Sequence, residues 1–106
     1  MKIPAEAIVP EEKITRYLLV YKARNDKSKF LERAGFSLQN SEELRIAIFS
    51  LSQSGEAVAD RNNEYGTFYR VDGELVGHNG VSLSVTTIWL QRASDGIFQF
   101  VTLKPS

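Results

Sequence analysis

The stretch Ser82-Leu83-Ser84-Val85-Thr86-Thr87-Ile88-Trp89-Leu90 decides the fold class of this chain. It is filled with β-branched and aromatic residues, which favour strands over helices. Alternate residues of a strand point to opposite faces of its sheet. The odd-numbered residues of the stretch therefore share one side and the even-numbered residues the other. Alternation alone does not decide which side meets the protein core.

Other segments of similar composition predict the rest of a sheet. The dipeptide Asn79-Gly80 is a signal for a tight hairpin turn, and Asp95-Gly96 marks a second turn. Strands are expected on both sides of each turn, with a weaker strand before them. The predicted strands are Ala57–Asp60, Thr67–Val71, Ser82–Leu90 and Ile97–Leu103. Because short turns connect the last three, we predict a four-stranded antiparallel meander.

The first half of the chain has the period of helices instead. Pro10 suits the first helical position, and the apolar spacing that follows predicts a helix over residues 10–21. A second helix is expected from an Asp26 cap to Gly35. A third opens at Asn40, with Glu43 in a near match to the capping box, and ends before Gly55. The sequence thus predicts an α+β fold: one domain, residues 1–106, with three N-terminal helices covering one face of the sheet.

Composition excludes several classes of function. The chain has 106 residues, no cysteine and one histidine, His78. These counts exclude a cysteine-based zinc site and a cysteine nucleophile, and no cofactor or metal is predicted. The first twelve residues lack the apolar run of a signal peptide, and no stretch has the ~20 apolar residues of a membrane span. We therefore expect a cytoplasmic protein without a membrane partner.

The charges balance overall but not locally. Lysine plus arginine equal aspartate plus glutamate, at 13 each. The segment from Lys13 to Arg33 has a net charge of +5, with seven cations and two anions, while Glu56 to Glu74 has five anions and two cations. This asymmetry indicates either a basic binding face on the N-terminal half or an ordinary solvated helix surface.

Six short pieces of the sequence occur in a recognisable order. They are Asp26-Lys27-Ser28-Lys29-Phe30, Gly35-Phe36, Tyr65-Gly66-Thr67-x-Tyr69, Gly77-x-Asn79-Gly80, Val85-x-Thr87-Ile88-Trp89 and Val101-Thr102-Leu103-x-Pro105. In this order they resemble a family of small bacterial domains of unassigned function, which occur alone and as the C-terminal module of polymorphic toxins. The resemblance covers nearly the whole chain.

The resemblance implies a toxin-like domain, a metal-independent ribonuclease or RNA-binding protein with its site on the open face of the sheet. A cognate antitoxin or immunity protein would neutralise it. Many members of the family carry a basic residue where this chain has Phe68, Thr86 and Gln99. Three expected phosphate contacts are therefore missing, and Arg70, on the same strand side as Phe68, is expected to replace one of them.

Two lysines stand at the start of the second predicted helix. A lysine in a first helical turn feels the positive end of the helix dipole, which favours the neutral amine, and the free N–H groups there attract anions. Lys27 and Lys29 are therefore candidates for phosphate binding or for a catalytic base. The alternative is that both are solvated surface residues.

Metal-free RNA cleavage needs a base, an acid and cations around the phosphate. In this interpretation Tyr65 or Tyr69 is the acid, Arg70 stabilises charge and Thr87 orients the phosphate. Trp89 would stack on a base, and the cations Lys22 and Arg24 would bind the nucleic acid. His78 is expected in an exposed turn. The alternative function is a non-catalytic interaction module, derived from a toxin, that binds a protein through its sheet.

Overall fold

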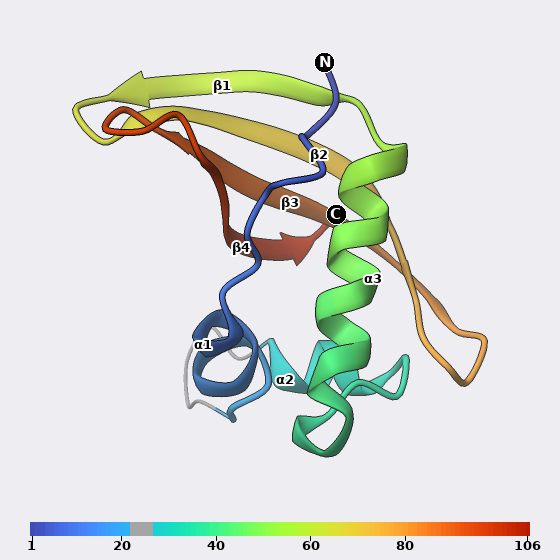
Figure 1. Cartoon of the computed structure of the whole chain (residues 1–106). Coiled ribbons are helices and arrows are strands. Elements are labelled where there is room, and N and C mark those ends of the chain that lie inside the picture. The colour runs from blue at the N-terminus through green and yellow to red at the C-terminus, as the bar shows by residue number, and fades with distance from the viewer. Residues whose placement is uncertain (22–26) are drawn as a thin grey trace.

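The structure is a computed structural model that describes residues 1–21 and 27–106 (Figure 1). Helices occupy the first half of the chain and four strands the second. The elements are α1 Glu11–Lys13, the π-helix Ile14–Leu18, α2 Ser28–Glu32, the 3-10 helix Leu38–Asn40, α3 Ser41–Ser54, β1 Ala57–Asn63, β2 Gly66–Val76, β3 Ser82–Arg92 and β4 Phe98–Pro105. The predicted α+β class is confirmed.

The sheet is the predicted antiparallel meander, in the order β1-β2-β3-β4. β2 and β3 pair along their whole lengths, from Gly66 opposite Arg92 to Val76 opposite Ser82. β2 is longer than its predicted segment because pairing continues through Gly73. A side chain there would meet α3, since an added Cβ would lie 2.8 Å from Leu51 Cγ. Glycine inside a strand often marks such a close approach.

The helices differ more from the prediction. The segment predicted as one helix over 10–21 contains a single α-turn followed by a π-helix, in which the Leu19 N–H donates to the Ile14 carbonyl at 3.1 Å. Such short helices have little stability of their own and depend on tertiary packing. Here Ile14 and Leu18 provide it, as both are buried.

Some starts and ends of the other helices lie at the residues that the sequence predicted, and others do not. The expected Asp26 cap lies outside the described residues. α2 ends at Glu32, before the predicted end at Gly35, and Gly35 adopts the left-handed conformation at φ 86° in the turn that follows. α3 begins directly after Asn40, but the capping box joins Asn40 to Ser37 and not to Glu43. Asn40 Oδ1 accepts from the Ser37 N–H at 2.7 Å, which fixes the turn before α3.

The core lies between the helices and one face of the sheet (Figure 1). Thr87 and Trp89 are fully buried there, so the odd-numbered residues of β3 face the helices. The other buried residues include Leu44, Ile48 and Leu51 of α3, Val71 and Leu75 of β2, Leu83 and Val85 of β3, and Phe100 and Leu103 of β4. This arrangement leaves the opposite face of the sheet to solvent.

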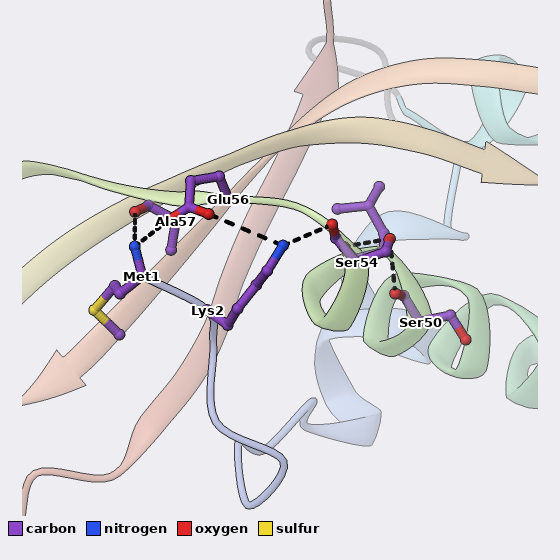
Figure 2. Close-up of polar contacts among 7 residues, drawn as sticks. Met1, Lys2, Ser50, Ser54, Glu56 and Ala57 are labelled. Carbon is purple, nitrogen blue, oxygen red and sulfur yellow. Dashed lines mark hydrogen bonds and ion pairs between the residues drawn. The ribbon is translucent and has the colours of Figure 1, made fainter.

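The first nine residues join the two edges of the sheet. The Ile8 N–H donates to the Phe98 carbonyl at 2.9 Å, and the Phe100 N–H donates to the Ile8 carbonyl at 2.8 Å, so Ile8 extends the β4 edge. Near β1, Lys2 Nζ donates to the Ser54 carbonyl at 2.9 Å and lies 3.9 Å from Glu56 Oε1 (Figure 2). Ile3 is buried between these ends. None of the helices in the two described ranges is long and apolar enough to cross a membrane.

Candidate functional site

Two of the predicted site residues form part of the core. Thr87 Oγ1 donates to the Val71 carbonyl at 2.8 Å and accepts from Trp89 Nε1 at 2.9 Å. Both side chains have 0% exposure. Each polar atom is thus satisfied inside the protein, as buried polar atoms usually are. In this position neither side chain can be reached by a phosphate or a base, so the burial does not fit the predicted RNA contacts.

The helix-start lysines contact tyrosines other than the predicted ones. Lys27 Nζ lies 3.2 Å from the Tyr17 hydroxyl, 2.9 Å from Thr102 Oγ1 and 5.2 Å from the centre of the Tyr17 ring. Lys29 Nζ lies 5.5 Å from the centre of the Tyr21 ring. A cation over an aromatic face is attracted by the ring quadrupole. Lys27 therefore connects α2 with the π-helix and β4, a contact that the lysine spacing alone did not indicate.

The remaining candidates lie in separate places. Tyr65 is 66% exposed in the β1–β2 turn, where its N–H donates to Asn63 Oδ1 at 2.9 Å. Tyr69 is half-buried on the helix side, with its hydroxyl 3.4 Å from Gln91 Oε1. Arg70 lies on the opposite face of the sheet, where its Nε is 3.7 Å from Asp72 Oδ2. Lys22 and Arg24 lie outside the described residues. The predicted base, acid and cations are not brought together in the described part of the chain.

His78 lies beside the start of α3. Its Nδ1 is 3.4 Å from Asn40 Nδ2 and 3.8 Å from Glu43 Oε1. It borders a cavity of about 460 Å³ between α3 and the β2–β3 hairpin, which Ile46 and Val76 also line. Within the described ranges, no group of three histidine, cysteine, aspartate or glutamate side chains is arranged to hold a metal ion.

The groups with a clearly shifted pKa are in surface ion pairs. The hydrogen bond from Arg92 lowers the pKa of Asp95, and the hydrogen bond from Arg45 lowers the pKa of Glu42. Both carboxyls are exposed, so these pairs contribute little to stability. Their shifts do not identify a catalytic group.

The face of the sheet opposite the helices is the broadest candidate surface. Cross-strand pairing arranges its outward side chains in rungs across the strands. We call this surface the open sheet face. Its residues are Arg61, Phe68, Leu90 and Gln99 in the first rung, Val58, Arg70, Ile88 and Thr102 in the second, Asp72, Thr86 and Lys104 in the third, and Glu74 and Ser84 in the fourth.

The two ends of the open sheet face differ in character. The first two rungs hold large apolar side chains and two arginines. The last two rungs are polar and surround a cavity of about 770 Å³, in which Thr86 donates to Asp72 Oδ1 at 2.6 Å. Phe68, Thr86 and Gln99, where the resemblance implied basic residues, all belong to this face. The sequence placed Arg70 with Phe68 correctly, because both positions share the parity of β2.

The fold has been seen in a solved protein complex. A chain of the contact-dependent growth inhibition toxin–immunity protein complex from Klebsiella pneumoniae 342 superposes with a TM-score of 0.72 and 18% sequence identity. The alignment covers 94% of this chain and 100% of that chain. At this identity the likeness establishes a shared fold.

Comparison of sequences gives a more specific result. Among curated proteins, none matches this sequence significantly. The profile of a family described as a domain of unknown function, DUF6883, matches residues 3–106. The match includes every helix and strand of the structure. The chain therefore belongs to the DUF6883 family.

Proposed function

We propose that this chain is an immunity protein, which binds a cognate toxin and blocks its action. The observation that carries the proposal is the full-length likeness to a chain of a toxin–immunity protein complex, at a TM-score of 0.72. In that interpretation the chain works through binding, and its partner is a toxin. The candidate catalytic side chains lie apart from one another, in the core, in the β1–β2 turn and on the open sheet face. This separation supports a binding role.

The proposal replaces the function expected from the sequence. We assign the chain to the immunity side of such a pair, and on this assignment the prediction of a ribonuclease toxin is wrong. The expected antitoxin partner is replaced by a toxin. The alternative of an interaction module derived from a toxin gains no support from the same likeness. RNA has no part in the proposed function.

The proposal predicts a harmless and protective protein. Expression of the chain alone should leave bacterial growth and cellular RNA unchanged, because binding, and not cleavage, is its activity. Expression together with the toxin encoded beside its gene should restore growth that the toxin alone arrests. Growth curves and total RNA on a gel measure both effects.

A toxin from an unrelated pair is the control for specificity. Protection should extend to the cognate toxin and not to the unrelated one, since specificity depends on a difference of affinities. Growth arrest by the chain alone, or failure to protect against the cognate toxin, would overturn the proposal.

A further inference from the structure

Most of the open sheet face is free of cover from the described helices, and at its β4 edge Lys27 Nζ donates to Thr102 Oγ1 at 2.9 Å. All described helices lie on the other side of the sheet (Figure 1). The N-terminal segment is on that side too, because Gln53 Nε2 of α3 donates to the Ile3 carbonyl at 3.0 Å. Arg61, Arg70 and Glu74 are accordingly exposed. Apart from Thr86, which is buried, the outward side chains of β2 and β3 are available to a partner.

The first two rungs carry more apolar side chains than the solvent-facing side of a sheet usually does. Antiparallel sheets with one face in water usually place polar residues outward. Here Phe68, Ile88 and Leu90 stand outward in neighbouring rungs and are half-buried only. Val58 beside them is 51% exposed. A contiguous apolar group on an otherwise polar surface is typical of an interaction site.

Two arginines complete this apolar group. The Arg61 guanidinium lies 4.7 Å from the centre of the Phe68 ring, and Arg70 stands between Val58 and Ile88 in the second rung. The residues of these two rungs include no carboxylate. Asp72 of the third rung lies 3.7 Å from Arg70, and exposed Asp60 stands at the bulge of β1 directly before Arg61. Arginine and aromatic side chains are enriched at the centres of protein interfaces.

The size of the face fits a protein partner. β2 and β3 have 11 residues each. β1 has 7 residues and β4 has 8, so at the usual strand spacing and rise the four strands present roughly 600 Å². A stable interface takes about 800 Å² of surface from each partner. The open sheet face therefore supplies most of one standard interface without help from the helix side.

We propose that the open sheet face is the surface that binds the toxin. This inference rests on the proposed function. The matching surface of the toxin carries carboxylates opposite Arg61 and Arg70, and apolar side chains that cover Phe68, Ile88 and Leu90. The polar third and fourth rungs form one side of the interface rim. Charge complementarity of this kind sets orientation and specificity more than affinity.

A double charge reversal tests the assignment. Arg61→Glu with Arg70→Glu should weaken binding of the purified cognate toxin at least tenfold, since two carboxylates would then face carboxylates. The matched control is Arg16→Glu with Arg33→Glu, two exposed arginines on the helix side. The control should change the dissociation constant less than threefold. Isothermal titration calorimetry measures both, after circular dichroism has established that each variant is folded.

A second measurement avoids any folding defect in the reversed variant. The photoreactive residue p-benzoylphenylalanine in place of exposed Val58 should crosslink to the toxin, and the same residue in place of Arg16 should not. Crosslinking only at Arg16, or equal affinity of the two double variants, would overturn the assignment while leaving the proposed function intact. If the unchanged chain binds no toxin, both proposals fail.

RNA is the other polymer that arginines and an aromatic ring can bind. A fluorescent single-stranded RNA, titrated with the same variants, separates the two partners. Toxin binding that needs Arg61 and Arg70 supports the assignment. RNA binding that needs them, with toxin affinity unchanged, would overturn it.

Discussion

Replacing Trp89 with alanine is expected to lower the free energy of unfolding by about 3–5 kcal/mol, the usual cost of truncating a buried large aromatic residue. The Trp89 side chain has no exposed surface and lies edge-on to Phe100, with ring centres 5.4 Å apart. Truncation would also leave Thr87 Oγ1 without the indole N–H that donates to it. Domains of this size are stable by only about 5–15 kcal/mol. Urea denaturation followed by fluorescence of the tyrosines or by circular dichroism measures the loss.

Two variants control this experiment. Tyr65→Ala should change the unfolding free energy by no more than about 0.5 kcal/mol, because Tyr65 is largely exposed and surface substitutions rarely cost more. Trp89→Phe should cost less than Trp89→Ala, since it keeps most of the apolar volume. If Trp89→Ala lost less than about 1 kcal/mol, Trp89 would not be a core residue, and its predicted role in stacking on a base would regain support.

Gly77→Ala is expected to destabilise the protein by at least about 3 kcal/mol, beyond the usual range for overpacking. An added Cβ at this position would lie 1.7 Å from the Ala34 carbonyl oxygen and 2.6 Å from its carbon. Backbone atoms cannot rotate away as a side chain can. The β2–β3 hairpin would have to separate from the turn after α2, where His78 lies against Gly35. Urea denaturation measures the change.

Gly80→Ala in the same hairpin is the matched control. No atom lies within 4 Å of an added Cβ there, but Gly80 has φ +84°. The backbone strain of a left-handed alanine costs about 1–2 kcal/mol. Gly77→Ala should therefore be clearly the more destabilising of the two. Equal losses would mean that strain in the hairpin, and not contact with Ala34, explains the presence of glycine.

The sheet was predictable because its signals are local. Asn79-Gly80 and Asp95-Gly96 occupy the turns that connect β2 to β3 and β3 to β4, with Gly80 and Gly96 both at positive φ. Tight turns between strands lead to an antiparallel meander. β1 runs to Asn63, beyond its predicted end at Asp60. The extent of β2 was missed because Gly73 reads as a break in the sequence. In the structure it is the position at which α3 approaches the strand.

The candidate site was harder to predict because it depends on contacts between distant segments. Lys27 and Thr102 are 75 positions apart, and no periodic pattern relates them. The prediction of a phosphate site at the start of α2 assumed that Lys27 would lie near Tyr65, Tyr69 and Thr87. Its amine is instead held by Tyr17 and by Thr102 of β4. The N-terminal segment gave no strand signal either. Its pairing with β4 through Ile8 uses backbone groups, which any residue but proline can supply.

By itself, the sequence determined the α+β class, the order of the strands and the two rows of side chains on each strand. These properties follow from turn chemistry and from the alternation of side chains along a strand. Only the tertiary structure decided that Thr87 and Trp89 face the core while Phe68, Arg70 and Ile88 face outward. Alternation is symmetrical between the two faces of a sheet, so the buried face is determined by which side the helices pack against.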